Sequence, residues 1–334
     1  MVFDQDSTFV RRDVDILKEV WDVEDHHFNS KPKWKTISAF AKLLFKLVFK
    51  RYDLVVTQSA GYLSLVPALL GKWGKHKCVI IVIGTDGACL PEINYGHFIR
   101  QPLAWATCRS LSMANLILPV HRSLESSTYT YDKVQHVQQG FRAFCPEITT
   151  QVVEIVNGYD HDRFHILTPW EERPLSFLTV AAHLSHVSFR RKGLDLIFDF
   201  AVRNPHLNFT VVSQLPTDIQ IPENVHLLPN VPQNELVAFY NQHKYYLQLS
   251  MFEGFPNALC EAMLCGCVPI GSNVAAIPEI IGEEGYLLQH KDVDELTAIV
   301  QTVSGSSKNP RQRIQQNFPL SRRSKELREA LQNA

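Results

Sequence analysis

Short apolar runs alternate along the first half of the chain with longer segments in which apolar residues recur at helical period. The apolar runs are strand-sized and cover residues 54–57, 79–83 and 116–118. The segments of helical period cover residues 9–20, 62–70 and 103–113. Buried strands that alternate with helices are typical of a parallel sheet that is covered by helices on both faces.

The same alternation restarts in the second half of the chain. The strand-like runs there cover residues 175–181, 209–212, 225–228, 245–249 and 268–271. The helical segments cover residues 194–202 and 233–241, and another helix is predicted from Asp292. Between the two halves lies the turn signal Asn157-Gly158-Tyr159-Asp160, which Pro169 and Pro174 follow.

We therefore predict an α/β fold in which two Rossmann-like parallel-sheet domains face a central cleft. The length of 334 residues suits two domains better than one core. The predicted parts are an N-terminal domain of residues 1–156, a hinge of residues 157–172, a second domain of residues 173–317 and a C-terminal helix of residues 318–334. A ligand is expected in the cleft, at the carboxyl ends of the strands.

Composition narrows the class of protein. Hydrophobic content of 45% and charged content of 20% indicate a soluble globular protein, and a net charge of −1 gives no field that would attract nucleic acid. The seven cysteines mostly lie in apolar runs, and Cys265 and Cys267 are the only close pair. We predict buried free thiols rather than a zinc site or a disulfide, and hence a reducing cytoplasm. Neither a signal peptide nor an apolar run of about 20 residues is found.

Residues 253–261 hold two carboxylates eight positions apart in an apolar stretch marked by glycine and proline. A predicted strand precedes this stretch and a predicted apolar helix follows it. A loop that leads into a helix N-terminus favours anions, because the first N–H groups have no partners and the helix dipole is positive there. Glu261 would lie within the helix, where a carboxylate is costly unless sugar or ribose hydroxyls bind it. Taken singly, Glu253 and Glu261 also fit a loop charge and a helix-dipole partner.

Four pieces of sequence, in register over the second half, carry a resemblance. They are residues 156–160 with Phe164, the strand at 177–182 followed by Arg191-Lys192-Gly193, residues 250–261, and the set Gly266, Pro269, Pro278-Glu279 and Gly285. In these the chain resembles the retaining, GT-B-fold glycosyltransferases of family 4. The resemblance covers most of the chain and is strongest from about residue 150 to 290.

The resemblance implies that the second domain binds a nucleotide-diphosphate sugar, that the first binds the acceptor, and that the last helix crosses back onto the first domain. By resemblance, Glu261 would accept hydrogen bonds from the ribose, Glu253 would bind hydroxyls of the sugar, and Lys192 would hold the diphosphate. The other donor-binding residues that it implies are Arg191, Gly254, Phe255, Pro256, Asn257 and Val231. A fixed cation near the leaving oxygen stabilises the charge that grows there, and it can replace a metal, so no metal or other cofactor is expected.

The chain departs from the family pattern at three places. Residues 3–9 contain no glycine, although members often have a glycine-rich loop after the first strand. The strand at 177–182 lacks the arginine that commonly grips the diphosphate, and Arg190, Arg191 or His183 are the alternatives. The loop at residues 84–87 carries Asp86 where many members have a histidine that reaches the transferred sugar. Asp86 would then bind a sugar hydroxyl or assist the acceptor, or else serve only the turn, and His97 and His121 are weaker candidates.

The predicted function is a metal-independent, retaining hexosyl transfer from a UDP-, GDP- or ADP-sugar to a glycan, lipid-linked or small-molecule acceptor. Two other classes stay open. One is a non-catalytic nucleotide-sugar-binding protein, and the other is a nucleotide-sugar epimerase or phosphorylase of similar fold.

The segment of residues 31–51 is basic and contains no acid. On a helix, Lys35, Lys42, Lys46 and Lys50 would share one stripe, which Phe45 and Phe49 border. This pattern predicts peripheral contact with an anionic membrane on its cytoplasmic face. A compatible interpretation is a domain helix that packs Ile37, Phe40, Ala41, Leu44 and Val48 on its own sheet.

Overall fold

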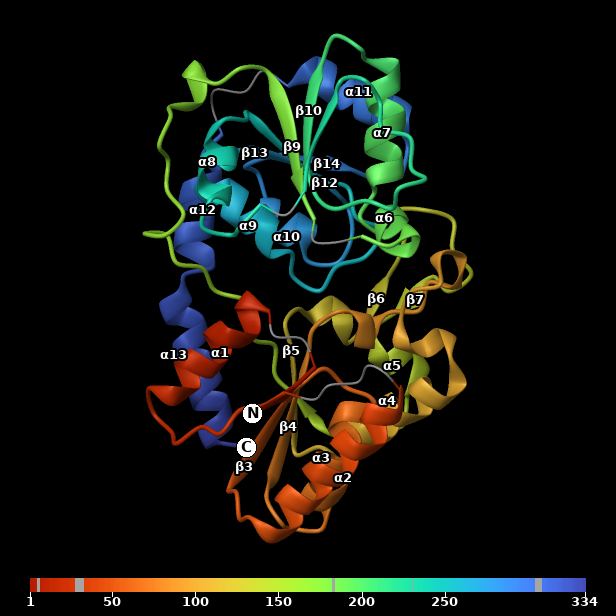
Figure 1. Ribbon diagram of the computed structural model, residues 1–334, viewed down its shortest axis with the longest axis vertical. Helices are drawn as coiled ribbons and strands as arrows, with labels where there is room; N and C mark the ends of the chain where they lie inside the picture. Colours follow the sequence, from red (N-terminus) through yellow and green to blue (C-terminus); the bar gives the residue numbers. More distant parts are fainter. Residues whose placement is uncertain (5–6, 28–32, 182–183, 230, 304–307) are drawn as a thin grey trace.

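The computed structural model describes residues 1–4, 7–27, 33–181, 184–229, 231–303 and 308–334, although not the side chains of residues 33–37. Two α/β units are stacked along the long axis of the molecule (Figure 1). Each contains a six-stranded parallel sheet with helices on its faces. The predicted fold class of two Rossmann-like domains is therefore confirmed.

The sheet of the first unit has the strand order β2-β1-β3-β4-β5-β8. Its strands are β1 (Val2–Phe3), β2 (His26–His27), β3 (Leu54–Gln58), β4 (Lys77–Val82), β5 (Leu116–Pro119) and β8 (Gln151–Val152). Its helices are α1 (Thr8–Lys18), α2 (Lys33–Phe49), α3 (Tyr62–Lys72), α4 (Gln101–Met113) and α5 (Phe141–Phe144), and β6 (Ser127–Thr128) and β7 (Gln138–Gln139) form a small antiparallel pair. Residues 78–82 of β4 are all buried, as expected for a central strand that is covered on both faces.

The sheet of the second unit has the order β11-β10-β9-β12-β13-β14. Its strands are β9 (Ser176–Val180), β10 (Asn208–Val212), β11 (Val225–Leu228), β12 (Tyr245–Gln248), β13 (Val268–Ser272) and β14 (Tyr286–Leu288). Its helices are α6 (His186–Arg191), α7 (Leu194–Arg203), α8 (Leu236–Asn241), α9 (Asn257–Leu264), α10 (Ile277–Ile281), α11 (Val293–Thr302) and α12 (Pro310–Asn317). The order reverses between β9 and β12, and such a switch point is where α/β sheets bind ligands.

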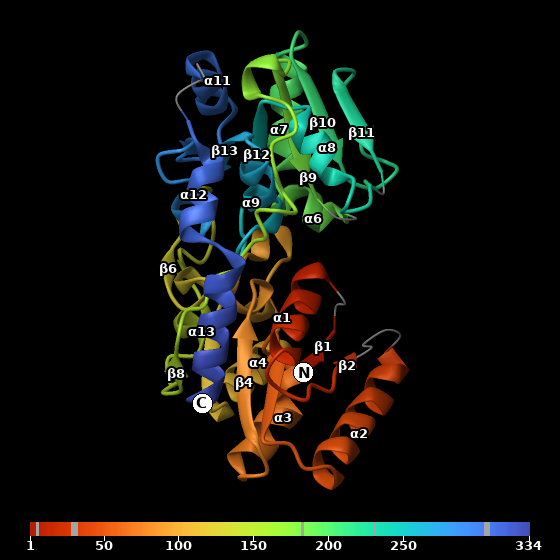
Figure 2. The same cartoon turned by 90° about the vertical axis from the view of Figure 1, so that its left-hand side faces the viewer.

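The last helix, α13 (Leu320–Gln332), lies against α1 of the first unit (Figure 2). Its Arg323 donates two hydrogen bonds to Asp13 of α1, at 2.8 and 2.7 Å, and both side chains are at most 2% exposed. The same guanidinium donates to the carbonyls of Ile155 and Val156, just before the hinge. Tyr159 pairs with the segment that enters α13, so the chain crosses between the units twice along one side.

The cysteine prediction is wrong for one pair. Cys108 of α4 forms a disulfide with Cys145, which follows α5, whereas the other five cysteines are free and buried. The fold brings the two Cα atoms to 5.4 Å although 37 residues separate them, so sequence spacing gave no signal. The cysteines therefore no longer support a reducing compartment. None of the described helices is long and apolar enough to cross a bilayer.

Helix α2 packs with a different face from the one predicted. Leu43 and Leu47 are buried against the sheet, whereas Leu44 and Val48 are 45% and 39% exposed. Phe45 and Phe49 are 65% and 73% exposed and extend the same outer face. Of the predicted basic stripe, Lys46 and Lys50 both bind Glu24, Lys42 is exposed, and the side chains of Lys35 and Ile37 lie outside the described residues.

Replacing Arg323 by Met should lower the free energy of unfolding by about 3–5 kcal/mol, because it leaves the Asp13 carboxylate buried without a cation. Urea denaturation measures the change. The Arg328→Ala variant is the control, because Arg328 binds the exposed Glu19 and its loss should cost less than about 1 kcal/mol. Equal stability of the two variants would contradict the role given to the buried pair.

Candidate functional site

The two glutamates lie on the strand–loop–helix unit that the sequence predicted. Strand β12 ends at Gln248, and helix α9 begins at Asn257 after Pro256. Both Glu253 and Glu261 are buried, at 8% and 3% exposure. Buried carboxylates need hydrogen bonds or cations, and the structure supplies them differently for the two residues.

Glu253 is surrounded by cations and donors. Its Oε1 accepts a hydrogen bond from Lys192 Nζ at 2.6 Å and from Ser250 Oγ at 2.8 Å, and Arg191 lies at 3.5 Å. Burial alone would raise the pKa of Glu253, but the charges of Lys192 and Arg191 outweigh it and hold the pKa below its usual value. Glu253 is therefore an anion at neutral pH.

Lys192 reaches this position because of the turn between α6 and α7. Gly193 has φ +72°, and a Cβ there would lie 2.0 Å from the carbonyl oxygen of Leu249. Only glycine fits both the left-handed conformation and the close approach to the end of β12. The turn is fixed further by a 2.7 Å hydrogen bond from Met251 N to the carbonyl of Arg191.

Arg191 connects the two units across the cleft. Its guanidinium lies 4.8 Å from the ring centre of Tyr95 in the first unit and donates to the carbonyl of Phe252 at 3.1 Å. Arg190 instead approaches the carbonyl of Glu92 at 3.5 Å. Of the alternatives for the missing arginine, Arg191 is thus the one beside Lys192 and Glu253, and His183 lies outside the described residues.

Glu261 has neutral partners. Gln233 Nε2 donates to its Oε1 at 3.1 Å, and the Tyr240 hydroxyl donates to its Oε2 at 3.2 Å. Burial raises the pKa of Glu261 to about 7, although the charges of Arg12 and Arg163 oppose the shift. The two glutamates therefore differ in charge near neutral pH. Val231 lies two residues before Gln233 and is partly buried, whereas Asn230 is outside the described residues.

The loop between the glutamates touches the first unit through its backbone. A Cβ on Gly254 would lie 1.9 Å from the carbonyl oxygen of Ile83, so only glycine allows this contact. The side chains that follow face the hinge. Phe255 is stacked on Tyr159 at 6.3 Å, and Asn257 Oδ1 accepts from the Tyr159 hydroxyl at 2.8 Å. The side chains of Phe255 and Asn257 are therefore engaged with Tyr159 of the hinge.

Asp86 holds loop backbone together in the structure, which is the turn role that the sequence left open as an alternative. The residue has no exposed surface. Its Oδ1 accepts from the backbone N–H groups of Ile83 and Gly84, and its Oδ2 accepts from that of Ala60. A carboxylate that is enclosed in this way positions two loops and has no surface for a sugar hydroxyl. Among the histidines, His121 binds Ser123 and Glu279, and His97 lines a separate cavity.

Sequence reasoning missed the partners that hold these groups. Tyr95, Gln233, Tyr240 and Ser250 each contact a candidate site residue. Only Ser250 carried a signal, since it stands three residues before Glu253 at the end of a strand. The others come from separate elements that the fold brings together.

Comparisons with known proteins find similar chains among glycosyltransferases. Residues 207–319 match the family model described as glycosyl transferases group 1. The chain is 33% identical to O-antigen chain mannosyltransferase B of Escherichia coli over 84 residues, which are 25% of this chain and 22% of that protein. It is 25% identical to the putative glycosyltransferase ORF330 of Acidianus filamentous virus 2 over 239 residues, which are 66% of this chain and 71% of that protein.

A solved structure shares the whole fold. HepE from Anabaena, crystallised in complex with UDP and glucose, superposes with a TM-score of 0.73 at 15% identity, over 100% of this chain and 99% of that one. The chain spans less than a quarter of the length of the bacterial mannosyltransferases that it matches, 22% of one and 8% of another. The matched segment is therefore similar to the glycosyl transferases of group 1, and the chain as a whole shares the GT-B fold of two facing parallel-sheet units.

Proposed function

We propose that the protein transfers a sugar from a nucleoside diphosphate sugar to a hydroxyl acceptor, with retention of configuration and without a metal. The observation that carries the proposal is the cluster of Lys192, Arg191 and Glu253 beside the N-terminus of α9. HepE, whose structure was solved with UDP-glucose, and the mannosyltransferases support a nucleotide-sugar donor. The acceptor classes are a glycan, a lipid-linked glycan or a small molecule.

The cations of the cluster match the charge change of this reaction. When the sugar–oxygen bond breaks, negative charge grows on the oxygen of the leaving diphosphate. Lys192, Arg191 and the first N–H groups of α9 are fixed donors, so they stabilise the transition state more than the ground state. Glu253 keeps Lys192 in place and has a further oxygen, Oε2, with which to bind a donor-sugar hydroxyl.

Glu261 is proposed as the nucleotide anchor. Its carboxyl group is anionic or neutral near pH 7, so it can accept or donate a hydrogen bond with the ribose hydroxyls. Gln233 and Tyr240 orient it from two sides. Gln233 also approaches Thr8 of the first unit at 3.5 Å, so the anchor lies where the two units meet.

A membrane surface is proposed as a partner of the first unit. The outer face of α2, formed by Leu44, Phe45, Val48 and Phe49, is apolar and exposed. Lys42 borders this face, and Arg51 and Lys50 follow its end. An exposed apolar helix face flanked by basic residues is typical of contact with anionic lipid. Such contact fits a lipid-linked acceptor.

The Lys192→Met variant should lower kcat by about 10²–10³-fold, because it removes a fixed cation from the leaving oxygen. Release of nucleoside diphosphate from a panel of UDP-, GDP- and ADP-sugars, with and without acceptor, measures this. Lys325→Met is the matched control, since Lys325 is exposed on α13 and its loss should change kcat less than about threefold. A Lys192→Met enzyme with near wild-type kcat would contradict the proposed role of Lys192. Tight binding of a donor by the wild type without turnover would favour a nucleotide-sugar-binding protein.

The Glu261→Gln variant should gain stability relative to wild type as pH rises. The pKa of Glu261 is higher in the folded chain than in the unfolded one, so its contribution to stability is present below about pH 4.5 and is lost as pH rises to about 7. The loss is up to about 3 kcal/mol, and glutamine does not suffer it. Melting temperatures at pH 5 and pH 8 should therefore favour the variant more at pH 8, while its thermal shift with UDP should be smaller.

Glu329→Gln is the control for this comparison, because that carboxylate is exposed on α13. A stability difference between Glu261→Gln and wild type that does not change with pH would contradict the raised pKa.

The Phe45→Ser/Phe49→Ser variant should sediment with vesicles of phosphatidylglycerol and phosphatidylcholine at no more than about half the wild-type fraction, because it removes two exposed rings of α2. Lys42→Glu should weaken binding further at low salt. Val202→Ser is the control, since Val202 is 65% exposed on the second unit. Co-sedimentation that both α2 variants leave unchanged would exclude this surface.

A further inference from the structure

Lys291 of the second unit forms an ion pair that lies beside the cluster of Lys192 and Glu253 without belonging to it. Its Nζ lies 2.6 Å from Asp195 Oδ2 and 3.8 Å from Met251 Sδ. Asp195 is in the first turn of α7, three residues after Lys192, and Met251 stands two residues before Glu253. The ammonium group of Lys291 therefore joins the two segments that carry the cation and the anion of the cluster.

These two segments also meet through their backbones. Met251 N donates to the carbonyl of Arg191 at 2.7 Å. Met251 is 2% exposed and the side chain of Lys291 is 12% exposed, so both links are largely shielded from water. The contact between Lys192 and Glu253 depends on how the turn between α6 and α7 packs against the loop after β12, and Lys291 binds both.

The backbone at Lys291 is fixed from both units. The N–H groups of residues 289 and 290 donate to the carboxylate of Glu295 in α11, at 2.6 and 3.0 Å. The next N–H group, that of Lys291, donates to the carbonyl of Tyr131 at 2.7 Å. Tyr131 belongs to the arm, by which we mean residues 129–137 between β6 and β7 of the first unit. Three consecutive N–H groups are therefore bound, and the last of them is bound by the first unit.

The arm is anchored because its aromatic rings are buried in the second unit. Tyr129 and Tyr131 are 6% and 1% exposed, and they pack in the core to which α7 and α11 contribute. Burial raises the pKa of Tyr131, and the nearby Tyr129 and Asp195 raise it further. Tyr131 therefore stays neutral and lies near the carboxylate that Lys291 binds.

We propose that Lys291 is a positioning residue for sugar transfer, which binds Asp195 and Met251 so that Lys192 stays fixed against Glu253, and that the arm of the first unit holds Lys291 in place. The proposal rests on the proposed transferase function, in which Lys192 stabilises the leaving diphosphate. Among the described residues Lys291 forms no ion pair with Glu253, so it acts through the segments that it joins. A misplacement of about 1 Å in a site can cost about 10²-fold in rate.

The first test is kinetic. Lys291→Met keeps most of the side-chain volume but loses the charge, so it should lower kcat about tenfold and leave KM for the donor within about twofold. Lys291→Arg keeps a cation that can bind Asp195, and it should bring kcat to within about threefold of wild type. Lys325→Met, which replaces an exposed lysine of α13, is the matched control and should change neither constant. Release of nucleoside diphosphate from the donor that the wild type uses measures both.

A double-mutant cycle separates positioning from general support of the fold. If Lys291 acts through Lys192, its loss should matter little once Lys192 is gone, so Lys291→Met should lower kcat less than about twofold in the Lys192→Met background. A lysine that only supports the fold would lower kcat by the same factor in both backgrounds. Equal factors would overturn the proposal, and so would a Lys291→Met enzyme with wild-type kcat.

Amide hydrogen exchange, followed by NMR, tests the positioning without any substrate. The Met251 N–H is bound by the carbonyl of Arg191, so its exchange reports whether the turn stays packed on the loop. Lys291→Met should speed this exchange at least about tenfold, whereas Lys291→Arg should not. The Cys267 N–H, which donates to the carbonyl of Ala262 at 3.0 Å, is the internal control, because general destabilisation would speed its exchange as well.

The same experiment tests the arm. Tyr131→Leu removes the ring that anchors the arm, so it should also speed exchange at Met251. Tyr131→Phe should not, because the Tyr131 hydroxyl makes no hydrogen bond to a described residue. Wild-type exchange at Met251 in Tyr131→Leu would overturn the part of the proposal that concerns the arm.

The results separate this proposal from the proposed function. Exchange at Met251 that Lys291→Met leaves unchanged, or that rises equally at Cys267, overturns the positioning role even if the wild type transfers sugar. If the wild type turns over none of the UDP-, GDP- and ADP-sugars, the transferase function fails, and exchange at Met251 still decides whether Lys291 fixes the turn that carries Lys192.

Discussion

The arrangement of the two units depends on one buried ion pair, Asp13 with Arg323. Both charges are removed from water, and the surrounding groups satisfy them, since Gln58 donates to Asp13 and the carbonyls of Ile155 and Val156 accept from Arg323. Neither charge can stay buried without the other, so α13 leaves the first unit only at a large cost. Because α13 follows directly on the second unit, this pair holds the hinge side of the cleft closed.

Glu253 and Glu261 have the same side chain, but their surroundings give them different pKa values. Glu253 faces Lys192 and Arg191, whose charges hold its pKa below the usual value, so it stays ionised and holds these two cations in place. Glu261 faces Gln233 and Tyr240, and burial brings its pKa to about 7, so it can also donate a hydrogen bond. Groups whose pKa values are driven apart in one site commonly divide its chemistry in this way.

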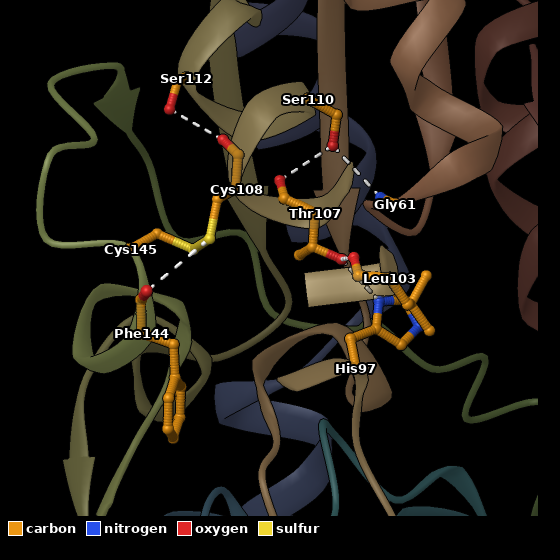
Figure 3. Close-up of a disulfide and its surroundings, with 9 residues drawn as sticks. All are labelled: Gly61, His97, Leu103, Thr107, Cys108, Ser110, Ser112, Phe144 and Cys145. Atoms are coloured by element: carbon orange, nitrogen blue, oxygen red, sulfur yellow. Dashed lines mark hydrogen bonds between the residues drawn. A yellow bond between two sulfur atoms is a disulfide. The ribbon is translucent and has the colours of Figure 1, made fainter. Parts of the chain in front are cut away.

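Features that arise from a continuous run of residues could be predicted from the sequence. Central strands such as β4 could be predicted because they are buried on all sides and therefore form a continuous apolar run. Strands β1, β2 and β8 have two residues each, which is too short to form such a run. Helix α2 is apolar on two opposite faces, so periodicity could not show which face meets the sheet. The glutamates stand in one segment and were predicted, but Tyr95 and Gln233 reach them only through tertiary folding. The disulfide between Cys108 and Cys145 could not be predicted either, because it too depends on tertiary folding (Figure 3).

The two units are joined by contacts of different kinds at α13 and away from it. On the hinge side stands the buried pair of α13, worth several kcal/mol if broken. Away from α13 the units meet through Arg191 on the Tyr95 ring, a contact of about 0.5–2 kcal/mol. They also meet through the buried rings of Tyr129 and Tyr131, which pack in the core of the second unit, where the Tyr131 carbonyl accepts from Lys291 N at 2.7 Å. Buried contacts therefore join the two units both at α13 and at the segment between β6 and β7. Tyr95 also hydrogen-bonds Thr85 in the wall of the cavity that His97 lines, so its ring links Arg191 of the second unit to that cavity of the first.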